Sequence, residues 1–180
     1  MRRSLLPLLL CLLLLPVSAA GVKNSAMLPR QISLRLNRQF PGWRFSRVSD
    51  DVTRFFSERW PDARPNLITG DFDGNRQLDY AILLEHSNFN EPGKAFSHVV
   101  EQLVFLKKGA TYQLHILDQR APANLELYIT LARKGEAGRE FNTQRIFRYP
   151  HDSISVSYFE KAGGTYIYRR GKFRYVIESD

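Results

Sequence analysis

The chain has 180 residues, and its 26 Lys and Arg against 18 Asp and Glu give a formal net charge of +8. Its single cysteine, Cys11, lies in an N-terminal segment that we expect to be removed, so disulfides and thiol chemistry are excluded for the mature chain. A basic protein can be drawn to an anionic polymer, an anionic lipid or an acidic protein. A solvated basic surface with no partner accounts for the charge equally well.

The first twenty residues have the features of an export signal. Arg2 and Arg3 precede an apolar run from Leu5 to Val17, and small residues suited to cleavage follow it. The run is shorter than the about 20 apolar residues that a membrane-spanning helix needs, so no transmembrane segment is expected in the mature chain. We expect a periplasmic or secreted protein. The expected divisions are a cleaved signal peptide at 1–20, a flexible leader at 21–27 and a single domain at 28–180.

Two short helices are predicted at the start of this domain. Apolar residues recur every four positions over 28–40, which is the pattern of one helical face, and Pro41-Gly42 ends that segment. Residues 43–48 alternate between apolar and polar, as a half-buried strand does. A second helix is predicted over 49–60, because Ser-Asp-Asp can cap it, large apolar side chains share one face and a proline follows.

The remainder of the chain is predicted to be β structure. Turn-forming pairs that contain glycine separate several segments, and the spacing leaves no room for crossover helices. We therefore expect an α+β domain in which the two helices pack on a mainly antiparallel sheet. An exposed loop is expected at 86–97. The predicted strands are 66–70, 78–85, 98–107, 111–118, 124–133, 143–149, 153–160, 164–169 and 172–178.

The segment after the first of these strands combines residue types and spacing that suit a metal ion. Side-chain oxygens fall at alternate positions of a glycine-containing turn, and an apolar strand follows at once. Calcium takes about six to eight oxygen ligands of this kind. A turn rich in Asp, Asn and Gly that holds no metal is the alternative. The predicted calcium ligands are Asp71, Asp73, Asn75, the backbone carbonyl of Gln77, and Asp79.

This loop is not an EF-hand, because the twelfth position, which should be a bidentate Glu, is Ile82 in a strand-like run. Gly70-Asp-Phe-Asp-Gly-Asn75 with Asp79 instead resembles the calcium loops of FG-GAP and VCBS-type repeats. The resemblance covers about 15 residues in a single copy, so it implies a calcium loop and excludes a β-propeller, which needs at least about four blades. At one glycine position of that pattern this chain has Arg76, which adopts positive φ only at a cost and places a cation beside the site.

The chain also resembles small uncharacterised exported bacterial proteins that are built around one such loop. That similarity spans most of the mature chain and implies no particular activity. Besides Gly70-Asp-Phe-Asp-Gly-Asn75, the residues that carry it are Phe40-Pro-Gly-Trp43, Asp79-Tyr-Ala81, Phe159-Glu-Lys-Ala162, Gly171-Lys-Phe-Arg174 and Ser179-Asp180.

Residues 166–175 interleave aromatic and basic side chains near the C-terminus. Such a surface can stack on sugars or bases and neutralise phosphates. In a hairpin that turns at Arg170-Gly171, however, alternation puts the aromatic residues toward the core and the basic residues in solvent. Export argues against nucleic acid as a partner, so carbohydrate or an anionic surface is the functional alternative. The four histidines lack zinc-ligand spacing, and no catalytic or phosphate-loop motif is present.

Three functional hypotheses follow. The leading one is a non-catalytic exported domain in which calcium locks one turn while another surface binds a partner, either an exported protein or an anionic cell-envelope polymer. The second is an inhibitor or immunity protein for a secreted hydrolase or toxin, which would use the 86–97 loop or the C-terminal hairpin. The third is a wall or polysaccharide hydrolase that would need carboxylates such as Glu85, Glu101 or Asp118 brought together by the fold.

Overall fold

The computed structural model describes residues 27–87, 98–120 and 125–179. The expected signal peptide, nearly all of the expected leader and residues 88–97 of the expected loop lie outside the described residues. Residues 86 and 87, which we expected in that loop, are the end of a strand. Within the described ranges, no helix is long and apolar enough to cross a membrane.

Both predicted helices are present, and each is shorter than its predicted segment. α1 (Arg30–Gln39) ends just before the Pro-Gly pair that was expected to stop it. A short strand, β1 (Arg44–Phe45), follows. α2 (Asp50–Arg59) begins after Ser49, whose hydroxyl accepts the Val52 N–H at 3.3 Å. The N-cap predicted from the sequence is therefore confirmed.

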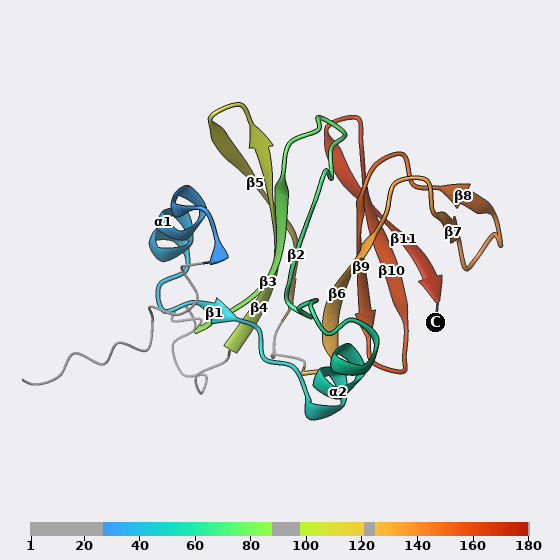
Figure 1. Ribbon diagram of the computed structural model, residues 1–180, viewed down its shortest axis with the longest axis horizontal. Helices are drawn as coiled ribbons and strands as arrows, with labels where there is room; N and C mark the ends of the chain where they lie inside the picture. The colour runs from blue at the N-terminus through green and yellow to red at the C-terminus, as the bar shows by residue number, and fades with distance from the viewer. Residues whose placement is uncertain (1–26, 88–97, 121–124, 180) are drawn as a thin grey trace, which may run out of the picture.

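The strands form two facing antiparallel sheets and a small third sheet (Figure 1). Sheet A has the order β1-β3-β4-β5, with β2 also paired to β3, and sheet B has the order β11-β10-β9-β6. Every strand pair among the described residues is antiparallel, which confirms the α+β prediction. Besides β1, sheet A contains β2 (Leu67–Gly70), β3 (Asp79–Ser87), β4 (His98–Lys108) and β5 (Thr111–Arg120), sheet B contains β6 (Leu127–Ala132), β9 (Ser153–Tyr158), β10 (Gly163–Arg169) and β11 (Lys172–Ser179), and the third sheet contains β7 (Ala137–Arg139) and β8 (Ile146–Arg148).

The hairpin of β7 and β8 is the main departure from the predicted strands. β7 was not predicted, because its sequence, Ala-Gly-Arg, has no apolar alternation. The strand predicted at 143–149 is shorter in the structure and is β8. Phe147 and Tyr149, at the end of this hairpin, pack against Ile167 of β10. The hairpin therefore covers part of the outer face of sheet B (Figure 1).

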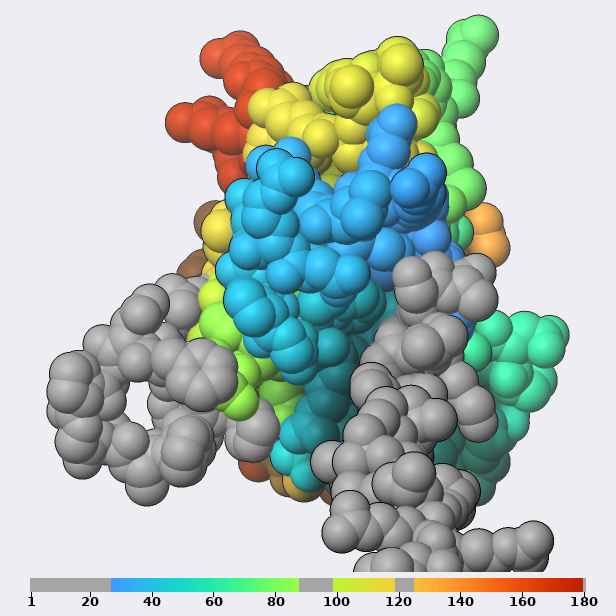
Figure 2. Space-filling model, turned by 90° about the vertical axis from the view of Figure 1, so that its left-hand side faces the viewer, coloured from blue at the N-terminus to red at the C-terminus, as the bar shows by residue number. Residues whose placement is uncertain are grey.

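β3 and β4 are buried on both faces, which explains why their sequences are nearly continuous apolar runs. On β3, Ala81 and Leu83 belong to the core between the two sheets. Ile82 and Leu84 belong to a second core beneath α1, in which Ile32 is completely buried. α1 lies across the outer face of sheet A as a single layer (Figure 2). Sheet A is thus the central layer of the domain.

α2 packs at the opposite end of the sandwich from the β2–β3 connection (Figure 1). Phe55 and Phe56 contact the ring of Tyr128 on β6, with centroid separations of 5.9 and 5.4 Å. Phe55 also contacts Phe159, at 5.5 Å. These tilted and edge-on aromatic contacts join α2 to sheet B. Both helices therefore pack on the sheets, as predicted.

Four connections meet at the end of the sandwich away from α2: the β2–β3 loop, the β4–β5 turn, the β8–β9 link and the β10–β11 turn (Figure 1). Phe72 of the β2–β3 loop is completely buried in the core between the sheets. Its side chain anchors a polar loop to the interior of the protein. The residues on either side of Phe72 are thereby held at a fixed place above the core.

Truncation of this anchor tests how strongly the loop depends on the core. We expect Phe72→Ala to lower the free energy of unfolding by about 3–5 kcal/mol, because it removes a fully buried ring and leaves a cavity. Leu34→Ala on α1 is the control, since Leu34 is 54 % exposed and its loss should cost within about 0.5 kcal/mol. Urea unfolding of both variants measures the difference. Equal destabilisation by the two variants would contradict the anchoring role.

Candidate metal centre

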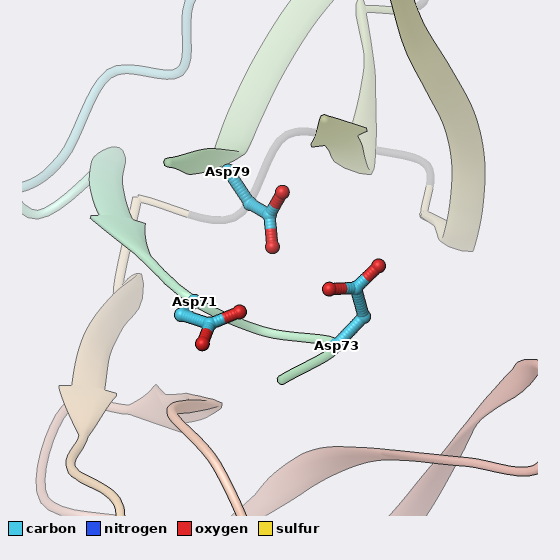
Figure 3. Close-up of side chains that lie close together, drawn as sticks. All are labelled: Asp71, Asp73 and Asp79. Atoms are coloured by element: carbon cyan, nitrogen blue, oxygen red, sulfur yellow. The ribbon is translucent and has the colours of Figure 1, made fainter. Parts of the chain in front are cut away.

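Three aspartates converge where the β2–β3 loop leaves and re-enters sheet A. Asp71 follows β2, Asp73 lies two residues farther along, and Asp79 begins β3. One oxygen of each carboxylate lies within 4.8 Å of the others. Figure 3 shows the three side chains turned toward a shared space. This cluster could hold a metal ion.

Asp79 is the buried member of the cluster and organises the backbone around it. Its side chain has no exposed surface. One carboxylate oxygen accepts the Phe72 N–H at 2.8 Å, and the other accepts the Lys107 N–H at 2.7 Å. The pKa of Asp79 is raised to about 6, above all because the carboxyl is buried. The two N–H donors lower it, while the charges of Asp73 and Asp71 act in the same direction as burial.

Asp71 contributes a buried oxygen that no described residue satisfies. Its Oδ2 accepts the Arg76 N–H at 3.0 Å, whereas its Oδ1 is buried and accepts no hydrogen bond in the described part of the chain. A buried carboxylate oxygen without a donor costs free energy comparable to a lost hydrogen bond. By contrast, all four carboxylate oxygens of Asp73 and Asp79 accept a hydrogen bond or form an ion pair.

Asp73 is held by the loop on one side and by a cation on the other. Its side chain is only 1 % exposed. Oδ1 accepts the Asn75 N–H at 3.0 Å, and Oδ2 accepts the Asn75 amide at 3.2 Å and the ammonium of Lys108. The hydrogen bond to Asp73 raises the pKa of Lys108. Lys108 therefore supplies one positive charge beside the three acidic groups.

Asn75 and Gln77 contribute to the loop through hydrogen bonds that shape the turn. The Asn75 amide donates to the Lys107 carbonyl at 2.7 Å, and its oxygen accepts the Gln77 N–H at 2.7 Å. These bonds shape the turn and place Asn75 against Asp73. The structure brings Asp71, Asp73 and Asp79 together. The assignments of Asn75 and of the Gln77 carbonyl as ligands stay predictions.

The turn requires two residues in the left-handed region. Gly74 has φ of +79°, and Arg76 has φ of +64°. Arg76 stands at a position where the FG-GAP and VCBS-type pattern has glycine, and its backbone adopts the left-handed conformation that glycine tolerates. A side chain at Gly74 would in addition clash with His151, since a Cβ would lie 2.9 Å from Nδ1. Glycine is thus required at 74, while Arg76 bears a conformational cost.

Sequence reasoning missed the residues that tie the loop to the rest of the protein. Asp152, from the β8–β9 link, accepts the Asp71 N–H at 3.1 Å and the Lys134 N–H at 3.0 Å. No role was predicted from the sequence for Asp152 or for Lys108. No local signal could reveal either role, because both partners are distant in sequence and the contacts arise when the sheets pack.

Comparisons of the chain with models of protein families, with curated proteins and with solved structures returned no match. The likeness to FG-GAP and VCBS-type loops therefore rests on the residues of the loop alone. What the structure supports is an acidic cluster of Asp71, Asp73 and Asp79 that could hold a metal ion.

Proposed function

We propose that the protein is an exported, non-catalytic domain in which one calcium ion binds the acidic loop and fixes the end of the sandwich that meets a partner. The ligands would be Asp71, Asp73, Asn75, the Gln77 carbonyl and Asp79. The ion would have a structural role, because the loop it would hold joins β2 to β3 and is bound to the end of β4 and to the β8–β9 link.

The buried Asp71 Oδ1 is the observation that carries this proposal. Three carboxylates lie within one small volume, yet Lys108 is the only described cation that forms an ion pair with any of them. A divalent cation would satisfy the unpartnered oxygen and neutralise the remaining charge. It would also offset the free-energy cost of a buried negative charge on Asp79, a cost that the raised pKa of this carboxyl reflects.

Calcium fits this donor set better than other common metal ions. All of the candidate ligands are oxygens, which excludes a preference for zinc or other metals that favour sulfur or imidazole. Magnesium demands a nearly regular octahedron and retains several waters, whereas calcium accepts irregular oxygen sets from a turned loop.

The hydrolase hypothesis receives no comparable support. Glu85 of β3 lies opposite Val100 of β4, and Glu101 lies opposite Leu84, so the two glutamates project to opposite faces of sheet A. Glu85 is also bound by Arg44 at 2.5 Å and by Arg47 at 3.3 Å. Burial raises the pKa of Glu85, but the hydrogen bonds from these arginines outweigh it and hold the pKa below its ordinary value. Such a group is a poor proton donor near neutral pH.

Thermal unfolding with added calcium tests the metal assignment. At a free calcium concentration about one hundred times the dissociation constant, we expect about 2.7 kcal/mol of stabilisation. The melting temperature should then rise by about 5–10 °C. Asp71→Asn with Asp73→Asn should abolish that rise while leaving the Asp79 backbone contacts in place. The matched control is Asp51→Asn with Asp62→Asn, at two exposed sites outside the loop. A melting temperature insensitive to calcium and to its removal would refute the proposal.

Replacement of Arg76 separates the effect of its charge on calcium affinity from the effect of its backbone strain on stability. We expect Arg76→Gly to bind calcium more tightly and to stabilise the metal-free protein by about 1 kcal/mol, because glycine adopts positive φ freely. Arg76→Gln should raise calcium affinity by removing the cation but should leave the strain and the metal-free stability unchanged. Calcium titration and urea unfolding measure the two effects. A lower calcium affinity in both variants would contradict this account.

The raised pKa of Asp79 predicts how binding depends on pH. A proton competes with calcium for this carboxylate, so affinity should fall about ten-fold between about pH 7.5 and pH 5. Because the pKa is higher in the folded state, about 6 against an ordinary 3.8, protonation stabilises the metal-free fold. That contribution is fully present below 3.8 and is lost as pH rises through 6. As the pH is lowered, the free energy of unfolding of the metal-free wild type should thus rise relative to that of Asp79→Asn. A difference between the two that does not change with pH would contradict the raised pKa of Asp79.

A further inference from the structure

An open pocket of about 590 Å³ lies beside the acidic loop, at the end of the sandwich where the four connections meet. The β10–β11 turn and the β8–β9 link form most of its wall, and the acidic loop contributes one residue. The lining is polar and mainly cationic. Its charged and aromatic members are Asp73, His151, Tyr168, Arg169, Arg170 and Arg174.

The arrangement of the cations is unfavourable for the protein alone. Arg169 lies directly opposite Lys172 across the hairpin, and Arg174 lies opposite Ile167, so Arg169, Lys172 and Arg174 share one face. Like charges directly opposite each other destabilise a strand pair. Among the described residues, no carboxylate forms an ion pair with these three or with Arg170, although other arginines and lysines of the protein do find acidic partners.

The wall of the pocket is held in place by hydrogen bonding. His151 Nε2 lies 2.7 Å from the carbonyl oxygen of Tyr168. A carbonyl only accepts, so this nitrogen carries the hydrogen. The other nitrogen of the ring, Nδ1, lies against Gly74 of the acidic loop. His151 therefore joins the hairpin to the loop, and the guanidinium groups project from a supported backbone.

Asp73 is the one acidic residue in the lining, and its charge is already compensated. Lys108 forms an ion pair with Asp73 Oδ2. The pocket thus retains the charge of three arginines. An anion that entered it would relieve the repulsion along the hairpin and would gain charge-assisted hydrogen bonds from guanidinium groups.

We propose that this pocket binds a phosphate group carried by a larger ligand. A carboxylate has two oxygens and is matched by a single guanidinium fork, whereas a phosphate presents more oxygens and up to two charges and can be shared among several arginines. The volume exceeds that of one phosphate, and the pocket is open, so the remainder of the ligand can extend into solvent. This inference requires no calcium and is independent of the proposed metal site.

The test is an NMR titration of isotope-labelled protein with two probes of similar charge, pyrophosphate and citrate. The protein is first freed of metal on a chelating resin, because soluble chelators are themselves anions. Salt is kept at about 150 mM, where charges more than about 8 Å apart are screened. We expect pyrophosphate to shift the backbone amides of 168–174 and to bind more tightly than citrate.

Arg169→Ala with Arg174→Ala should weaken pyrophosphate binding by about ten-fold or more, since each lost guanidinium removes charge-assisted hydrogen bonds. Both residues are exposed, so the fold should tolerate their loss. The matched control, Arg30→Ala with Arg38→Ala, removes the same charge from exposed positions of α1, which lies on the other side of the molecule from the β10–β11 hairpin (Figure 1). It should change affinity by less than about two-fold.

Other outcomes overturn the proposal. If citrate bound as tightly as pyrophosphate, the pocket would have no preference for phosphate over carboxylate. If the hairpin amides did not shift, or if both double variants weakened binding equally, pyrophosphate binding would reflect only the general attraction of an anion to a basic protein. Asp71→Asn distinguishes this proposal from the calcium site, because that variant should lose calcium binding and retain pyrophosphate binding. Loss of both would show that the pocket depends on the metal loop and would contradict the independence of the two sites.

Discussion

The hydrogen bonding of the buried Asp79 carboxylate is the interaction on which the end of the sandwich that carries the acidic loop depends. One oxygen holds the backbone of Phe72 in the β2–β3 loop, and the other holds the backbone of Lys107 at the end of β4. A single buried group thus joins the β2–β3 loop to the end of β4. The cost is a negative charge in the interior, which raises the pKa of Asp79 and calls for a compensating cation nearby.

The charges at this end of the sandwich are arranged in two layers. The acidic groups lie inside, anchored to the core through Phe72, and the basic groups of the turns lie outside. Lys108 links the two layers through its ion pair with Asp73. An inner cluster of negative charge and an outer rim of positive charge therefore lie a short distance apart, and the ion pair of Lys108 with Asp73 connects them.

The sandwich explains why these connections meet at all. β3 and β4 are buried on both faces, so sheet A is held between α1 and sheet B and cannot shift without exposing one of two cores. The ends of the strands then have fixed positions. The β8–β9 link is brought to the acidic loop through the bond between Asp152 and the Asp71 N–H, although 81 residues separate them in the chain. Packing of the two sheets makes that contact.

Local patterns in the sequence were sufficient to predict the two helices, most of the strands and the acidic loop, because capping residues, periodicity and turn residues act over a few positions. The same local reasoning placed Arg76 at a position of positive φ. It did not find β7, whose residues show no alternation, or the second sheet as a separate layer. The ion pair of Lys108, the anchoring by Asp152 and the cationic pocket were decided by the tertiary structure, because each joins segments that meet only when the sheets pack together.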